Sequence, residues 1–122
     1  MLPHTCLPSS LPIPAQMLQI GDPGGLTVGE ARVHFATWAV TSSLMLIGAP
    51  LNNIDSASLG ILKTPGIVAV SQDRGGSRQG GRVSAPNLQG PECWAKHMSD
   101  GSAAVVLINR GAEGVSNVTC TW

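Results

Sequence analysis

Strand-like and helix-like segments alternate through residues 17–73, which read MLQIGDPGGLTVGEARVHFATWAVTSSLMLIGAPLNNIDSASLGILKTPGIVAVSQD. Met17–Ile20, Leu44–Ile47 and Ile67–Val70 are short apolar runs bounded by glycine, proline or polar turns, as buried strands are. Two helical patterns lie between these runs. The alternation therefore predicts right-handed strand–helix–strand units with parallel strands.

Both expected helices carry start and stop signals. Thr27 and Glu30 have the spacing of a capping box, in which each side chain bonds the other residue's backbone N–H. An apolar stripe at helical spacing follows, made of Val28, Ala31, Phe35 and Trp38. Asp55 is a suitable N-cap for a second helix through Leu62, and the sequence around Pro65 predicts its end.

The composition changes after Asp73. Residues 74–90, RGGSRQGGRVSAPNLQG, are rich in glycine, arginine and serine without an apolar period, which predicts a linker. Two β-prone runs, Cys93–Met98 and Ala103–Asn109, flank an Asp-Gly turn and predict a hairpin. Residues 115–122 predict a further strand. At the other end, four prolines within residues 1–15 predict an irregular lead.

Bulk properties restrict the class of protein. A chain of 122 residues with 43% hydrophobic content suits one modest domain. Seven basic residues balance seven acidic ones, so we expect neither nucleic acid nor a membrane as partner. No apolar run approaches the roughly 20 residues that span a bilayer, and residues 1–15 lack the basic start and apolar core of a signal peptide.

The cysteines are Cys6, Cys93 and Cys120, an odd number that leaves at least one unpaired. We expect free or partly paired thiols. No Cys/His spacing suggests zinc, so no metal and no cofactor is predicted. His34 has no partner one helical turn away and is expected to be a surface residue rather than a ligand.

Several short motifs have both a chemical and a structural interpretation. Arg74-Gly75-Gly76, with Arg78 and Arg82 nearby, is similar to RNA-binding segments, but the absence of interleaved aromatics favours a solvated linker. Gly21–Gly25 precedes a helix as phosphate-binding loops do, but matches no known pattern and favours a turn. Asp22 follows an expected strand and is a candidate carboxylate. Asn117-Val118-Thr119 is a glycosylation sequon.

Taken together and in order, the segments of residues 16–122 resemble the α-galactosidases, the melibiase-type retaining glycosidases of glycoside hydrolase family 27. The resemblance lies in Met17-Leu18, Phe35-Ala-Thr-Trp38-Ala-Val, Leu46-Ile47-Gly48, Leu51-Asn52-Asn53-Ile54, Leu59-Gly-Ile-Leu62, Val68-Ala-Val-Ser-Gln-Asp73, Trp94, Val105-Val-Leu-Ile-Asn109-Arg110 and Val118-Thr119.

This resemblance implies a mixed fold, α/β followed by all-β. The family fold is a (β/α)8 barrel followed by an antiparallel β-sandwich. By that comparison, residues 16–73 are the last two βα units of the barrel and 74–90 are the linker. Residues 91–122 are then part of the carboxy-terminal sandwich, and the irregular lead 1–15 has no counterpart. Two βα units do not close a barrel, so we expect exposed edges and apolar faces in the isolated chain.

The resemblance also implies a reaction, the hydrolysis of terminal α-D-galactosyl residues. Retaining glycosidases use two carboxylates about 5–5.5 Å apart. In the family both are aspartates on earlier barrel strands, so we expect no catalytic residue in this chain. Gln16 stands where the family has a substrate-side aspartate, and Met17 would line the sugar pocket. Asp73 is retained from the family pattern, whereas Pro50 replaces an aspartate.

The expected function is therefore that of a carboxy-terminal piece of an α-galactosidase, inactive alone. The longer parent would take an α-galactoside as substrate, can be a homodimer, and in this family is typically secreted, vacuolar or lysosomal. Two alternatives remain: a non-catalytic carbohydrate- or protein-binding remnant that uses the β region, and an RNA-contacting protein that uses residues 74–82.

Overall fold

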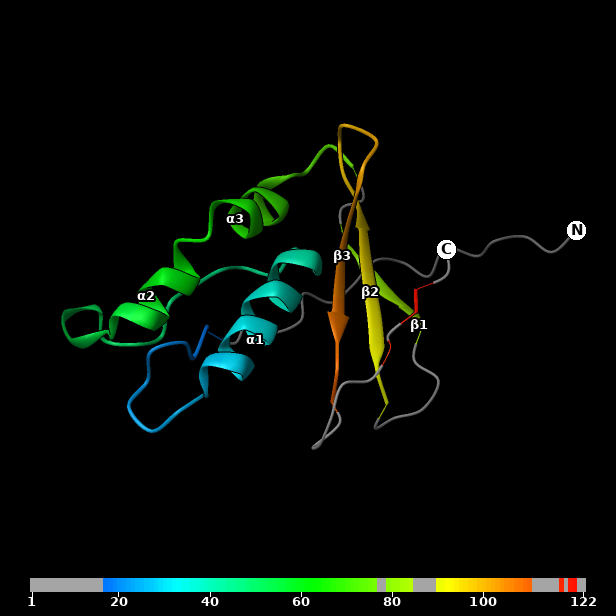
Figure 1. The fold of residues 1–122 in the computed structure, drawn as a ribbon. Coiled ribbons are helices and arrows are strands. Elements are labelled where there is room, and N and C mark those ends of the chain that lie inside the picture. The colour runs from blue at the N-terminus through cyan, green and yellow to red at the C-terminus, as the bar shows by residue number, and fades with distance from the viewer. Residues whose placement is uncertain (1–16, 77–78, 85–89, 111–116, 118, 121–122) are drawn as a thin grey trace, which may run out of the picture.

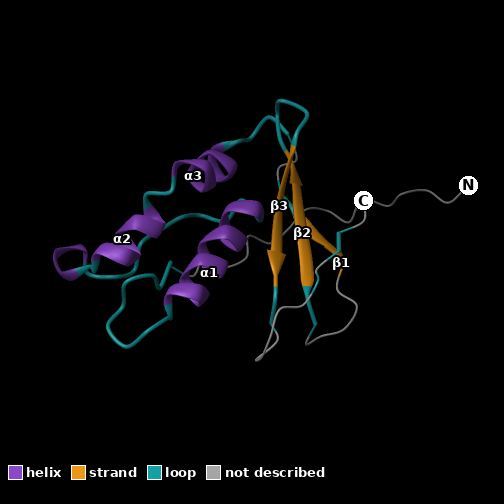
Figure 2. Cartoon of the chain, viewed as in Figure 1, coloured by secondary structure: helices purple, strands orange, loops and turns teal. Residues whose placement is uncertain are grey.

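A computed structural model describes residues 17–76, 79–84, 90–110, 117, 119 and 120. Its elements are the helices α1 (Val28–Val40), η1 (Leu51–Asn53), α2 (Ser56–Leu62) and α3 (Pro65–Gln72), and the strands β1 (Gly81–Ser84), β2 (Glu92–His97) and β3 (Ala103–Ile108). The helices lie on one side of the sheet, and α1 contacts α2, α3, β2 and β3 (Figures 1 and 2). α1 thus joins the helical layer to the sheet.

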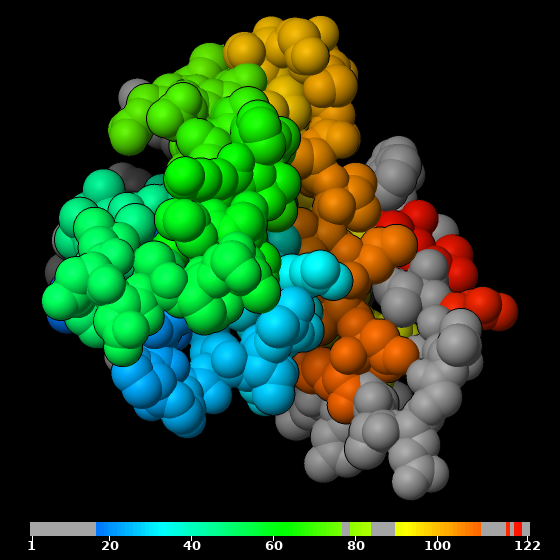
Figure 3. Space-filling model, turned by 60° about the vertical axis from the view of Figure 1, so that its left-hand side comes forward, coloured from blue at the N-terminus to red at the C-terminus, as the bar shows by residue number. Residues whose placement is uncertain are grey.

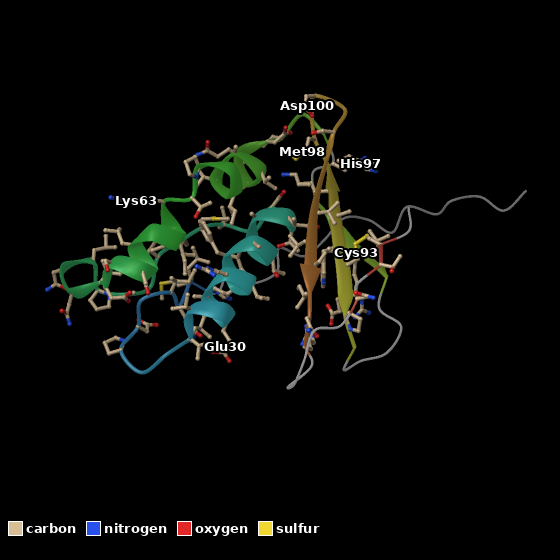
Figure 4. The ribbon with its side chains drawn as sticks, in the orientation of Figure 1. Glu30, Lys63, Cys93, His97, Met98 and Asp100 are labelled. Atoms are coloured by element: carbon tan, nitrogen blue, oxygen red, sulfur yellow. A yellow bond between two sulfur atoms is a disulfide. The ribbon has the colours of Figure 1, made fainter. Side chains whose placement is uncertain are left out.

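The capping box predicted for α1 is confirmed. The Thr27 backbone N–H donates to Glu30 Oε2 at 2.8 Å, and the Glu30 backbone N–H donates to Thr27 Oγ1 at 3.3 Å. The hydrogen bond from the Thr27 backbone is the main cause of the lowered pKa of Glu30. Figure 4 shows Glu30 in the first turn of α1. The sequence therefore fixes where this helix begins.

The core lies between α1, α2 and two apolar segments that precede and follow α1. Its buried residues are Leu18, Ile20, Ala31, Phe35 and Ile61, with Trp38, Met45, Leu62, Ile67 and Val68 packed against them. The predicted stripe on α1 is correct for Ala31 and Phe35, but Val28 is 49% exposed. Val28 is the first residue of the helix, where few neighbours reach it.

The predicted start and end of α2 are confirmed, but the strand predicted at 67–70 is wrong. Asp55 caps α2 by accepting a hydrogen bond from the Ser58 N–H at 2.8 Å. After a two-residue break, Pro65 begins α3 at its first helical position, where the missing proline N–H costs nothing. Ile67 and Val68 then pack on the core from a helix. The β-branched run is thus overridden by tertiary contacts.

The predicted hairpin is also confirmed. β2 pairs antiparallel with β3 from Glu92↔Ile108 to His97↔Ala103. Gly101, with φ of 85°, allows the turn, and the Asp100 carboxylate accepts from the Ser102 N–H. Figure 4 shows Asp100 at the tip of the hairpin.

β1 is a departure from the sequence-based expectation, because it lies inside the range 74–90 predicted to be a linker. β1 pairs antiparallel with β2, so the strand order is β1-β2-β3, and its register shifts between Arg82 and Ser84. Most of the strand predicted at 115–122 falls outside the described residues; Asn117, Thr119 and Cys120 are described and lie in no strand.

A buried lysine joins the end of α3 to the sheet. Lys96, 1% exposed, donates from Nζ to the Val70 carbonyl at 2.6 Å and the Asp73 carbonyl at 2.8 Å. These carbonyls belong to the carboxyl end of a helix, where a cation is favoured. The Asp73 carboxylate in turn accepts from the Ser99 N–H at 3.0 Å and hydroxyl at 2.7 Å. We call Lys96, Asp73 and Ser99 the helix–sheet junction.

Candidate functional site

The candidate site lies where the apolar segments before and after α1 run parallel. Leu18 and Ile47 form an isolated parallel bridge: the Leu18 N–H donates to Leu46 O at 2.6 Å, and the Gly48 N–H donates to Leu18 O at 2.9 Å. The strands predicted at 17–20 and 44–47 are therefore reduced to one bridge. Parallel pairing is confirmed at that point, but a ladder is not present.

Met17, a predicted substrate-binding residue, lies at this bridge. A Cβ atom placed on Gly48 would be 3.0 Å from Met17 Cβ, so the two residues are in direct contact. Met17 is 56% exposed, and Leu44 and Leu46 of the neighbouring segment are exposed to a similar extent. We call Met17, Leu44, Leu46 and Ile47 the bridge surface. Gln16 lies outside the described residues.

A glycine turn holds the two segments together just after the bridge. Gly21 has φ of 93°, and a Cβ atom there would lie 2.7 Å from Ile54 Cγ1 and 3.5 Å from Ala49 Cβ. Any larger residue would both strain the backbone and push away the loop that follows the second segment. The Gly21–Gly25 motif is thus a turn, as favoured above, and Gly25 N–H donates to Asp22 O at 3.0 Å.

Five of the six described carboxylates take part in structural hydrogen bonds rather than in a reactive pair. Glu30 and Asp55 cap helices. Asp73 accepts a hydrogen bond from Ser99, and Asp100 accepts one from Ser102. Glu92 accepts from Trp94 Nε1 at 2.9 Å and forms an ion pair with Arg110 Nε at 2.8 Å. The sixth, Asp22, lies in the glycine turn.

The carboxylates of the hairpin turn and the junction are unsuited to acid catalysis. The Ser99 hydroxyl is the main cause that lowers the pKa of Asp73 to about 2, and the Ser102 hydroxyl lowers the pKa of Asp100. A general acid needs a pKa near the working pH. Both groups are therefore ionised acceptors at neutral pH.

His34 is half-buried, not the surface residue predicted. Its ring lies 4.1 Å from the Trp38 ring, between centroids, and burial lowers its pKa. His34 Nε2 is buried with no hydrogen-bond partner among the described residues. No group of three or more metal-ligating side chains occurs in the part of the chain that the structure describes. The imidazole thus packs as a neutral ring beside the core.

Two shallow grooves separate the helices from β3, away from the bridge surface. One, of about 560 Å³, is lined by α1, α2 and β3, including Arg32, Ala57 and Leu107. The other, of about 400 Å³, lies between α1, α3 and β3. Their linings are mainly small and apolar, so they offer few groups to orient a polar ligand.

Within the described residues, no helix combines the length and hydrophobicity required to cross a membrane.

The helix–sheet junction accounts for the two glycines of the Arg74-Gly75-Gly76 motif. The Asp73 carboxylate accepts from the Gly75 N–H at 3.1 Å and the Gly76 N–H at 3.2 Å. A Cβ atom on Gly76 would collide with the His97 carbonyl on β2. Glycine is therefore required here for close approach of two backbones, while Arg74 is exposed. Arg78 lies outside the described residues.

Sequence reasoning missed Lys96, Glu92 and the Cys93–Cys120 disulfide, which links Cα atoms 5.7 Å apart. The only sequence signal for the first two was one charged residue directly before the β-prone run and another inside it. No sequence signal chose between Cys6 and Cys120 as the partner of Cys93, and Cys6 lies outside the described residues.

The known proteins that this chain is similar to agree with one another. No family model matches the chain. Its sequence is 35% identical to the α-galactosidase of Cyamopsis tetragonoloba and 36% identical to that of Coffea arabica, over 87% of this chain in each case. The chain spans only 25% and 27% of those relatives.

Solved structures agree with the sequence matches. An α-galactosidase from Saccharomyces cerevisiae with raffinose superposes on 79% of this chain with a TM-score of 0.70 and 28% identity. A putative α-galactosidase/melibiase from Bacteroides fragilis superposes on 78% with a TM-score of 0.71 and 30% identity. The chain covers 23% and 22% of those structures, and it corresponds to their carboxy-terminal part.

Proposed function

We propose that this chain, which is homologous to the carboxy-terminal part of the α-galactosidases, is that part of a glycoside hydrolase acting on terminal α-D-galactosyl residues. The agreement of sequence and fold over most of the chain, with only about a quarter of each relative covered, carries the proposal. The activity belongs to a protein of the relatives' full length. In that protein, this chain would supply scaffold and one wall of the pocket.

We further propose the finer fold of that parent. Residues 16–73 would be the last two βα units of a (β/α)8 barrel, 74–90 the linker, and 91–122 the beginning of an antiparallel β-sandwich. Three observations support this: the parallel bridge, the helix α1 that connects its two segments, and the antiparallel sheet that follows. β1 shifts the beginning of the β region to Gly81, inside the proposed linker.

The bridge surface supports the proposed barrel. Its apolar side chains are exposed, and a single bridge leaves most backbone groups of both parallel segments unpaired with each other. Parallel strands in soluble proteins are normally covered on both faces. In a barrel, neighbouring strands and the barrel interior would supply that cover.

We assign Met17, and with it Gln16, to the wall of the galactoside pocket. Met17 directly precedes Leu18 of the parallel bridge and lies against Gly48 of the facing segment. Its thioether is unbranched and exposed, which suits apolar contact with a sugar face. The catalytic carboxylates would come from residues outside this chain, since those described here serve as caps, turns and ion pairs.

A chimera tests the proposal. Residues 17–122 would replace the matching carboxy-terminal part of the Coffea arabica α-galactosidase, and release of aryl alcohol from an aryl α-galactoside would be followed. We expect the chimera to be active and the isolated chain to be inactive. A folded but inactive chimera would overturn the proposed function, and turnover by the isolated chain would overturn the assignment of catalysis to other residues.

Substitutions in the chimera test the pocket. Met17→Ala should raise KM severalfold, whereas Met98→Ala, the same change at the hairpin, should leave KM unaltered. Equal effects of both variants on KM would show that Met17 does not line the pocket. Titration of the isolated chain with galactose separates the alternative: saturable binding without hydrolysis would favour a carbohydrate-binding remnant.

A further inference from the structure

Asn117-Val118-Thr119 is the only Asn-X-Ser/Thr sequence in the 122 residues, and its middle residue is not proline. This pattern is the acceptor for N-linked oligosaccharide when it lies on the surface of a protein in the secretory pathway. Asn117 is exposed. The structure thus meets the first of the two conditions for modification at this residue.

The disulfide bears on the second condition, entry into the secretory pathway. Cys120, three residues after Asn117, is bonded to Cys93 on β2. Disulfides form and persist in oxidising compartments such as the lumen of the endoplasmic reticulum, and they are rare in the cytosol. The same lumen is where N-linked oligosaccharide is transferred. Two independent features, one of sequence and one of tertiary structure, therefore indicate one compartment.

We propose that Asn117 carries an N-linked glycan. In the transfer step, Asn117 Nδ2 attacks the anomeric carbon of an oligosaccharide on a polyprenyl diphosphate. The new C–N bond replaces the C–O bond to the diphosphate, the lipid diphosphate leaves, and one proton is lost from Nδ2. The amide thus becomes a glycosylamide with no oxidant or reductant required.

The fold places this glycan away from the helices. Lys96 reaches the end of α3, so its side chain is on the helical face of β2. Side chains alternate along a strand, so Cys93, three residues earlier, points to the opposite face. Cys120 is held there, and Figure 3 shows the described residues near the carboxyl end on the far side of β3 from the helices.

Asn117 is at most roughly 10 Å from Cys120 along the chain, since an extended residue spans about 3.5 Å. A glycan at Asn117 would therefore be attached close to the Cys93–Cys120 disulfide. The modification is compatible with the proposed function but does not depend on it.

Translation of the chain behind a cleavable signal peptide, in the presence of endoplasmic reticulum microsomes, tests the proposal. We expect one protease-protected species with lower gel mobility, restored by an N-glycan-releasing amidase that leaves aspartate at position 117. Asn117→Gln should abolish the shift. Thr119→Ser, which preserves the sequon, and Asn52→Gln, which changes an asparagine outside it, should both retain the shift.

Translocated, protease-protected wild-type chain without an amidase-sensitive shift would overturn the proposal, as would a shift that persists in Asn117→Gln. Because transfer takes place on the newly made chain, loss of folding in a variant does not obscure the result. The readout is also independent of α-galactosidase activity, so failure here and failure of the proposed function are distinguishable.

Discussion

The helical region, residues 17–76, and the sheet region, residues 79–84 and 90–110 with 117, 119 and 120, are held together in different ways. The helical region depends on a small buried core around Phe35 and leaves the bridge surface exposed. The sheet region has two antiparallel strand pairs, regular between β2 and β3, and a disulfide between residues 27 positions apart. The helical layer and the sheet are separate in Figure 2 and meet along α1.

This difference follows from how antiparallel and parallel strands pair their backbone groups. An antiparallel hairpin satisfies its backbone groups through a short turn, whereas parallel strands need crossovers and neighbours on either side. The strands of the sheet region therefore pair with one another, whereas the two parallel segments of the helical region pair at a single bridge. Region-resolved measurements can test that asymmetry.

The largest expected effect is at the centre of the helical core. Phe35→Ala should lower the free energy of unfolding by about 3–5 kcal/mol, because it removes a buried aromatic side chain and leaves a cavity. Hydrogen exchange read by mass spectrometry should show faster exchange in α1, α2 and α3 and little change in β2 and β3. Val33→Ala on the exposed face of α1 is the control. Equal loss of protection in both regions would show that they unfold as one unit.

Loss of the disulfide should have the opposite effect on the two regions, with faster hydrogen exchange in the sheet region than in the helical region. Replacing Cys93 and Cys120 with serine should lower the free energy of unfolding by about 3–4 kcal/mol, the chain-entropy value for a loop of this length. Faster exchange should be confined to β1, β2 and the residues near Cys120. If α1 is affected as strongly as β2, the disulfide supports both regions and the asymmetry does not hold.

Lys96→Met tests the junction between the regions. The change keeps the length of the side chain but leaves the Val70 and Asp73 carbonyls without their buried donor, at a cost of about 1.5–3 kcal/mol. Exchange should accelerate at the end of α3 and in β2 together. Lys63→Met, at an exposed position, should have no measurable effect. A similar result for both lysines would show that the buried ammonium group adds nothing.

The smallest expected effect is a dependence of stability on pH in the acid range. The pKa of Asp73 is lowered from 3.8 to about 2, so between these values the unfolded chain binds a proton that the folded chain does not. The contribution of Asp73 to stability is thus complete above pH 3.8 and is lost as pH falls through about 2. Urea unfolding from pH 5 to pH 2 should show a weaker pH dependence in Asp73→Asn. An unchanged dependence would contradict the role of Ser99 in holding this carboxylate.

Local signals in the sequence were sufficient where a few neighbouring residues complete an interaction. The Thr27–Glu30 capping box, the Asp55 cap and the Asp100-Gly101 turn each close within three or four residues, and all three are present. β1 was not predictable in this way, because glycine and arginine in residues 74–90 give no apolar period, and its pairing is with β2.

The run 67–70 shows the limit of local propensity. Its β-branched residues favour a strand, but Pro65 begins a helix there and the core accepts Ile67 and Val68 in that form. The candidate site shows the same limit: Met17 was chosen by resemblance, and only the structure places it beside Gly48 at an exposed bridge.

The sequence by itself determined the helix caps, the hairpin turn and the glycosylation sequon, because each depends on residue identities at short spacing, and it carries the resemblance to the α-galactosidases. Tertiary structure alone decided the pairing of Cys93 with Cys120, the burial of Lys96 against the end of α3, and the reduction of the parallel strands to a single bridge. Such features join residues distant along the chain, and their stability depends on which surfaces the rest of the fold brings together or leaves open.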